Sequence, residues 1–311
     1  MKRFRKISLR VLLISFIILN ISAAFHAWHF THFVKTDQPK TKLDELQTVD
    51  KVKLLFFGLA NPRPQNLRFP DSPYETFKVR QGEHDLEVWR VPVDSAHGEV
   101  ILFHGYSGEK SSMLDRAKLI QEMGYNTWLV DFYGSGGSSG NTTSIGYREA
   151  EDVVAVIDFV KKKSNKRIML LGTSMGAAAI MRAAHNGKLS AERIVIECPF
   201  GSMLQTSKNR FNKLGAPSFP AAHLLVFWGG IENGFWGFSH NPKRYAESVD
   251  VPSLLIYGEQ DDRVTRHEID AVYERLAGKK QLVLLPKAGH ANYLQTEKRA
   301  WQTAVANFLR E

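Results

Sequence analysis

The stretch RIMLLGTSMGAAAIMRAA, from Arg167 to Ala184, carries the strongest fold signal in this sequence. Its first part, Ile168 to Leu171, is an uninterrupted apolar run that predicts a strand buried on both faces. A turn through Gly172-Thr173-Ser174-Met175-Gly176 follows, and the alanine-rich remainder predicts a helix. A serine between two glycines at such a junction is either a residue of an ordinary tight turn or a nucleophile held at the sheet edge.

Strand and helix patterns alternate on both sides of this stretch. Helical periodicity runs through 146–163 and 300–310. Strands are predicted at 75–80 and 85–93, paired around a turn near Gly82, and then at 99–103, 125–132, 193–197, 253–258 and 281–286. This rhythm predicts an α/β fold, in which helices cover both faces of a mostly parallel central sheet.

One segment interrupts the alternation. From about 201 to 246 the chain is rich in aromatic residues and glycine, and its apolar run is too short to cross a membrane. We predict a cap insertion there, within a domain that spans 76–311. Residues 36–75 form a polar, proline-bearing approach segment, and 1–35 form a separate N-terminal segment.

The N-terminal segment has a basic start followed by fifteen uncharged residues from Val11 to Phe25, which predict a hydrophobic helix. It is either a signal peptide cleaved after Ala24, or an uncleaved membrane anchor of roughly 20 residues extending to about Phe30. The basic flank stays on the cytoplasmic side in both cases. We therefore expect an exported domain that is membrane-anchored, or secreted or periplasmic if cleavage occurs.

Metal and nucleic-acid binding receive little support. His26, His29 and His32 recur every three residues, which suits either a metal site or interfacial residues beside a membrane; we expect the second and no metal. The single cysteine, Cys198, excludes an intrachain disulfide. The net charge of +9 is concentrated before Asp37, and the remainder carries only about +3, so no nucleic-acid partner is expected.

Two later residues supply what Ser174 needs to act as a nucleophile, namely a base and an acid that orients the base. Asp261 follows the strand predicted at 253–258, and His290 follows the strand predicted at 281–286. Both lie beyond the carboxyl ends of strands, where open α/β sheets hold their sites. Asp262 is the alternative acid.

In their order along the chain these motifs resemble the α/β-hydrolase family, over about residues 76–309. The nearest group is that of capped lipases, esterases and serine-aminopeptidase-like hydrolases. The motifs that carry the resemblance are His104-Gly105, Asp131 with the GSGGSSG loop, Gly-Thr-Ser-Met-Gly around Ser174, Gly258-x-x-Asp261-x-x-Val264 and Ala288-Gly289-His290.

The resemblance implies Ser174 as nucleophile, His290 as general base and Asp261 as the orienting acid. It places the oxyanion hole at the backbone N–H groups of Met175 and Tyr106. His104 then shapes the oxyanion loop. Tyr133 stands where the family usually has arginine, which leaves open how Asp131 is paired.

The function that follows is hydrolysis of a carboxylic ester through a seryl acyl-enzyme. Thioester hydrolysis, peptide hydrolysis and acyl transfer use the same triad, and a non-catalytic exported binding protein is the other class. No cofactor is expected, since Ser139 breaks the dinucleotide pattern that begins at Gly134. The expected partners are a small or lipid-like acyl substrate and a membrane, with the acyl group held by Phe227, Trp228, Phe235 and Trp236.

Overall fold

The computed structural model describes residues 2–36, 61–290 and 292–311. These residues form two compact units, each of which is described by itself. The helical unit contains Met1–Pro62 and Met203–Ser239, and the sheet unit contains Arg63–Ser202 and His240–Glu311. The segment predicted as a cap, 201–246, contains Met203–Ser239 of the helical unit together with residues 201–202 and 240–246 of the sheet unit.

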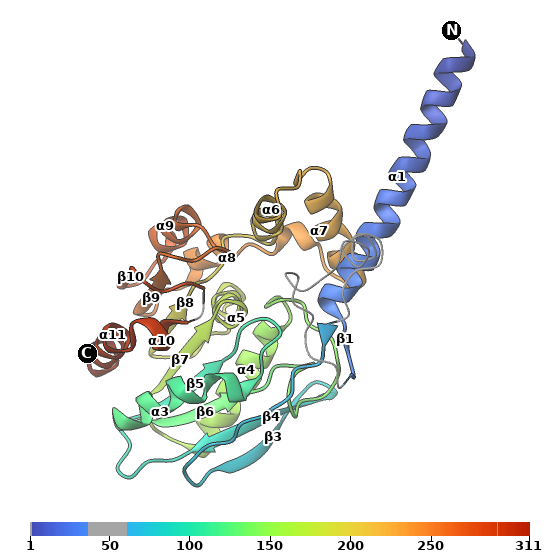
Figure 1. Ribbon diagram of the computed structural model, residues 1–311. Coiled ribbons are helices and arrows are strands. Elements are labelled where there is room, and N and C mark those ends of the chain that lie inside the picture. The colour runs from blue at the N-terminus through green and yellow to red at the C-terminus, as the bar shows by residue number, and fades with distance from the viewer. Residues whose placement is uncertain (1, 37–60, 291) are drawn as a thin grey trace. The chain divides into compact units, whose positions relative to one another are not determined.

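The sheet unit is built on an eight-stranded sheet whose strand order is β10-β9-β8-β7-β5-β6-β4-β3 (Figure 1). The pairings from β10 to β6 are all parallel, and β3 and β4 extend the sheet as an antiparallel pair. The prediction of a mostly parallel sheet is therefore confirmed. The strands are β3 (Glu75–Gln81), β4 (His84–Val91), β5 (Glu99–Phe103), β6 (Asn126–Val130), β7 (Ile168–Thr173), β8 (Arg193–Glu197), β9 (Ser253–Gly258) and β10 (Lys280–Leu285).

Successive residues of a strand point to opposite sides of the sheet. Because the central strands are buried at every position, both faces of the sheet are apolar and both are covered by helices. Val100 and Leu102 of β5 share one buried cluster with residues of α3 and α11, such as Ala117 and Trp301. On the opposite face, Trp128 of β6 packs edge-on against Phe159 of α4. The helices of this unit are α3 (Leu114–Glu122), α4 (Glu149–Lys163), α5 (Met175–His185), α8 (Pro242–Tyr245), α9 (Arg266–Arg275), α10 (Tyr293–Thr296) and α11 (Lys298–Arg310).

The register of the strands places three candidate site residues at one edge of the sheet. Phe103 at the end of β5 pairs with Gly172 of β7, and Thr173 pairs with Glu197 at the end of β8. The loops that follow these strands therefore start side by side. The strand ends thus place His104, Ser174 and Cys198 at the same sheet edge.

The helical unit begins with a long N-terminal helix, α1 (Lys2–Thr31). Its segment Ser8–Thr31 has a mean hydropathy of 2.0 and is long and apolar enough to cross a membrane. The predicted hydrophobic helix is therefore present. Among the described residues of this unit, the other elements are β1 (Phe33–Val34), β2 (Asn61–Pro62), α6 (Met203–Lys213), α7 (Ala221–Glu232) and the 3₁₀ helix Gly237–Ser239.

The approach segment predicted at 36–75 lies partly outside the described residues. Where it is described, β2 and the start of β3 fall within it, so it contains short strands as well as loop. Asn61 and Pro62 pair in parallel with Phe33 and Val34.

Candidate active site

Ser174 occupies a sharp turn between β7 and α5. Its backbone has φ 51° and ψ −104°, a conformation that a residue with a side chain adopts only when its surroundings hold it there. The Ser174 N–H donates to the carbonyl of Glu197 at 2.8 Å, and the Ser174 carbonyl accepts from the N–H of Ala178 at 3.0 Å. Both backbone groups are therefore fixed by neighbouring elements.

The two glycines around Ser174 are required by close packing. A Cβ at Gly172 would lie 2.6 Å from the carbonyl carbon of Gly176. A Cβ at Gly176 would lie 2.4 Å from the carbonyl oxygen of Phe103. Because both contacts are with backbone, no side-chain movement could relieve them, and the turn needs glycine at each position.

The structure brings Ser174, His290 and Asp261 into one hydrogen-bonded chain. The Nε2 atom of His290 lies 3.1 Å from the Ser174 hydroxyl, and its Nδ1 atom lies 2.7 Å from Oδ2 of Asp261. The other oxygen of Asp261 accepts the N–H groups of Arg263 and Val264 at 2.8 and 3.0 Å. The carboxylate is thus held from two sides, and the residue that reaches the imidazole is Asp261, the first of the two candidate acids.

The environment of His290 sets its proton affinity. Burial lowers the pKa of the imidazole, whereas the Cys198 sulfur and the hydrogen-bonded Asp261 carboxylate raise it, and the raising effects prevail. Cys198 is buried, and its thiol donates to the His290 carbonyl at 2.8 Å. Potential metal ligands on Cys198, Asp261 and His290 lie within 4.8 Å of one another, although the last two are already bonded to each other.

The predicted oxyanion residues also lie near Ser174. Met175 is the first residue of α5, and the first N–H groups of a helix have no acceptor within the helix. A Cβ on Gly105, the residue before Tyr106, would lie 3.7 Å from the Ser174 Cβ. The loop after β5 therefore passes beside the serine. The oxyanion roles of Tyr106 and Met175 remain predictions.

His104 is fully buried, and backbone groups occupy both of its ring nitrogens. Nδ1 donates to the Gly105 carbonyl at 2.8 Å, and Nε2 accepts the Phe132 N–H at 3.2 Å. Burial lowers the pKa of His104, which agrees with a neutral ring that joins two loops. This placement fits the loop-shaping role expected for it.

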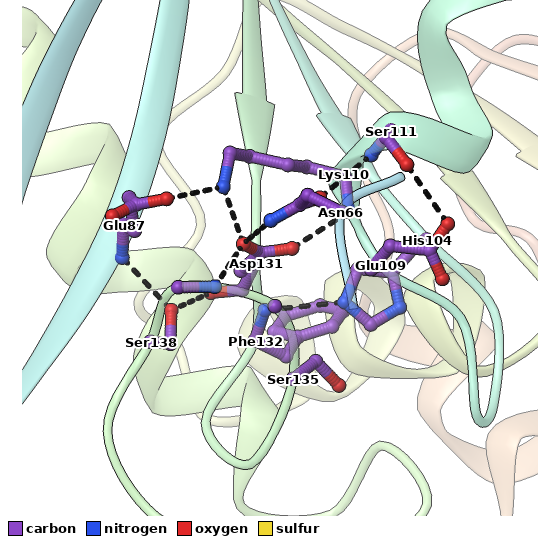
Figure 2. A network of polar contacts seen from close by, with 12 residues as sticks. Asn66, Glu87, His104, Glu109, Lys110, Ser111, Asp131, Phe132, Ser135 and Ser138 are labelled. Atoms are coloured by element: carbon purple, nitrogen blue, oxygen red, sulfur yellow. Dashed lines mark hydrogen bonds and ion pairs between the residues drawn. The ribbon is translucent and has the colours of Figure 1, made fainter. Parts of the chain in front are cut away.

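Asp131 lies at the centre of a buried polar network, drawn in Figure 2. The Lys110 ammonium forms an ion pair with it and also binds Glu87 at 2.7 Å. The carboxylate accepts three further N–H groups, from the Lys110 backbone at 2.7 Å, the Asn66 side chain at 2.7 Å and the Gly137 backbone at 2.8 Å. Lys110 thus supplies the positive charge that Tyr133 cannot.

An arginine from the approach segment holds the glycine loop itself. The Arg63 guanidinium donates to the carbonyls of Gly136, Ser138 and Gly140 at 2.7, 2.6 and 3.0 Å. The Gly136 N–H in turn donates to the Pro64 carbonyl at 3.0 Å. Arg63, Asn66 and Lys110 were not anticipated from the sequence, because nothing local to them indicates which loop they reach.

The four aromatic residues predicted to hold an acyl group lie in the helical unit. Phe227 and Trp228 belong to α7, and the rings of Phe227 and Trp236 have centroids 6.1 Å apart. Trp236 is 56% exposed. Phe235 precedes it directly. Their contact with substrate remains a prediction, as does the membrane partner.

Comparison with known proteins adds a similarity to one enzyme family. Residues 94–227 match the model described as "Serine aminopeptidase, S33". The Bacillus subtilis protein YqkD is 25% identical over 230 residues, which cover 73% of this chain and 75% of that protein. Lysophosphatidylserine lipase ABHD12 of Xenopus tropicalis is 21% identical over 63% of this chain and 50% of its own length.

Solved structures agree on the fold. The Pyrococcus furiosus esterase Pf2001 superposes with a TM-score of 0.67 at 24% identity, over 80% of this chain and 96% of the esterase. The sheet order, the turn at Ser174 and the matched family model are consistent with one another. The chain therefore has the α/β-hydrolase fold, and its residues 94–227 are similar to the serine aminopeptidase (S33) family.

Proposed function

We propose that the protein hydrolyses a carboxylic ester through a seryl acyl-enzyme, with Ser174, His290 and Asp261 as its catalytic triad. The observation that carries this proposal is the continuous hydrogen-bonded chain from Asp261 through His290 to the Ser174 hydroxyl. A serine hydroxyl attacks a carbonyl only when a base removes its proton, and this chain provides both the base and the group that orients it.

In the first half of the reaction, the Ser174 oxygen attacks the ester carbonyl while Nε2 of His290 accepts the hydroxyl proton. The developing oxyanion accepts hydrogen bonds from the N–H groups of Met175 and Tyr106. His290 then gives the proton to the departing alcohol. Water completes the cycle by the same steps, releasing the acid and restoring Ser174.

We also propose that α1 is retained and anchors the protein in a membrane. The supporting observation is that the helix continues without interruption past Ala24, the position at which a signal peptidase would cut, as far as Thr31. Trp28, half exposed and stacked on His32 with ring centroids 3.4 Å apart, provides an aromatic residue at the outer interface. The sheet unit is then exported on the far side of the bilayer.

A fluorophosphonate probe tests the catalytic proposal directly, since it reacts only with an activated serine. We expect covalent labelling of the wild-type protein and none of Ser174→Ala, with intact-mass spectrometry as the measurement. Ser190→Ala, which changes an exposed serine, is the matched control and should label fully. A folded wild type that does not label would refute the proposal. Ester, thioester and aminoacyl substrates of graded length then distinguish the alternatives.

The pH profile of the reaction tests which aspartate orients His290. His290 acts as a base only when its imidazole is neutral, and its raised pKa keeps the imidazole protonated to higher pH. The acid limb of kcat/KM should therefore lie above 6.5, the ordinary value for histidine. Asp261→Asn removes a charge that raises this pKa, so the limb should move to lower pH while kcat falls by about 10⁴.

Asp262→Asn is the matched control for that experiment. It should leave the acid limb in place and change kcat by no more than about threefold, since the neighbouring carboxylate is the one that holds the imidazole. The opposite pattern, with the large loss in Asp262→Asn, would assign the acid to Asp262.

A further inference from the structure

The N-terminal helix and the cap helix pack against each other within the helical unit. Ala23, Ala27 and Thr31 recur every four residues and form the buried face of α1. A Cβ at Gly229 of α7 would lie 3.8 Å from the Ala27 Cβ, so the two helices approach closely at small residues. Close approach at small residues is how helices associate in lipid.

A polar side chain in the apolar part of α1 joins the two helices. The Trp228 indole N–H of α7 donates to Oδ1 of Asn20 at 3.2 Å. The Asn20 amide nitrogen donates to the Phe16 carbonyl at 2.9 Å. Both ends of the amide are therefore satisfied without water, as a polar group within a bilayer requires.

The rest of α1 and part of the cap expose apolar side chains. Of the 18-residue apolar window of α1, only 6% is buried. The cap segments contribute exposed residues of the same kind, and α7 carries ionisable residues only near its two ends, His223 and Glu232. The exposed apolar residues of the cap are Leu214, Phe219, Ile231 and Trp236.

The position of Asn20 along α1 fixes how deep this contact would lie. If the span runs from Val11 to Phe30, it covers about 30 Å at 1.5 Å per residue, and Asn20 lies about 15 Å from either end. The bond to Trp228 then falls near the middle of the bilayer. Because α7 packs on Ala27 and reaches Asn20 through the Trp228 side chain, this part of α7 would then lie inside the bilayer.

The other helix of the cap, α6, has the basic composition of a helix that lies at the surface of a membrane. Lys208, Arg210 and Lys213 make α6 basic, and it has no acidic residue. The Arg210 guanidinium lies over the Phe30 ring, 5.1 Å from its centroid, at the end of the apolar span. Basic residues at this level suit the phosphate groups of anionic lipids.

We propose that α7 lies in the same bilayer as α1, so that the cap is embedded in the membrane and the substrate is a long-chain acyl ester that resides there. The substrate part of this proposal rests on the proposed ester hydrolysis, whereas the location of α7 does not. Lipid acyl chains then cover the exposed apolar surfaces of α1 and α7. The ester reaches the enzyme from the membrane, without first passing through water.

Depth-dependent fluorescence quenching tests the location. The full chain is labelled with a polarity-sensitive maleimide dye at Ile231→Cys on α7, Ile14→Cys on α1 or Leu67→Cys in the sheet unit, all at exposed positions. The buried Cys198 makes the wild type the unlabelled blank. Each is reconstituted in phosphatidylcholine–phosphatidylglycerol vesicles.

Dye at positions 14 and 231 should be quenched by lipids carrying a nitroxide in mid-acyl chain and shielded from aqueous iodide, and dye at position 67 should show the reverse. Iodide access at position 231 equal to that at position 67 would overturn the embedding of α7. If position 14 alone is shielded, α1 is an anchor but the cap lies outside the bilayer, which also overturns it.

Kinetics test the substrate class. Ile231→Lys places a charge on the surface proposed to face lipid, and we expect at least about a tenfold loss of activity on a long-chain ester in vesicles. Its activity on a water-soluble acetate ester in detergent, and its fluorophosphonate labelling, should not change. Leu67→Lys, the matched control, should match the wild type on both substrates.

The outcomes separate the two proposals. If the wild type fails to label, the ester-hydrolase proposal fails, although the quenching result still stands. If the wild type labels but Ile231→Lys keeps full activity on the vesicle ester, or loses both activities equally, the membrane-resident substrate is excluded.

Discussion

Replacing Ser174 with alanine should lower kcat for ester hydrolysis by about 10⁶, with little change in KM, because the nucleophile acts in the transition state and contributes little to substrate binding. The hydroxyl lies 3.1 Å from Nε2 of His290, the base proposed to remove its proton. The measurement is the steady-state rate on a chromogenic ester, with circular dichroism to show that the variant folds.

The double variant makes this prediction sharper. His290→Ala alone should reduce kcat by a similar factor, and adding it to Ser174→Ala should reduce the rate by less than about tenfold more, since the triad acts as a unit. Losses that multiply across the two variants would show that Ser174 and His290 act independently, contrary to the geometry.

Replacing Lys110 with alanine should destabilise the protein by about 3–5 kcal/mol, because it leaves a fully buried carboxylate without its cation. Both side chains of the Lys110–Asp131 pair are 0% exposed. Three N–H groups would still contact Asp131, so its hydrogen bonds persist while its charge is left uncompensated. Urea unfolding, read as the change in midpoint at constant slope, gives the difference.

Lys118→Ala is the matched control for this measurement. Lys118 pairs with Asp71 at 3.1 Å, and the two side chains are 64% and 82% exposed. An exposed pair of this kind contributes about 0–1 kcal/mol. Lys110→Met tests charge apart from volume and should destabilise nearly as much as Lys110→Ala. Equal small effects at positions 110 and 118 would show that Asp131 does not depend on the lysine.

Much of the sheet and the order of the candidate site follow from local patterns. Buried runs such as 168–171 indicate strands without reference to anything distant, and the glycines on either side of Ser174 indicate the turn. Asp261 and His290 could be placed because the carboxyl ends of parallel strands share one edge. The resemblance to a known family then gave these positions their roles.

What could not be predicted depends on contacts between distant parts of the chain. Asn66 bonds to Asp131 across 65 positions, and Trp228 bonds to Asn20 across 208. A lysine in the loop after β5 has the same local pattern whether it faces solvent or a buried carboxylate. For the same reason the sequence did not show that Cys198 lies beside His290, or that the aromatic cap segment pairs with the N-terminal helix.

The contacts of Arg63 and Asn66 set a practical limit on where the catalytic fragment can begin. A soluble fragment started at residue 76, the first residue of the predicted domain, would lack the guanidinium that gathers the carbonyls of Gly136, Ser138 and Gly140. It would also lack Asn66, so Asp131 would lose one of its hydrogen-bond donors. Expression of the sheet unit without the N-terminal helix should therefore start upstream of residue 63, so that the fragment keeps the residues that hold the glycine loop.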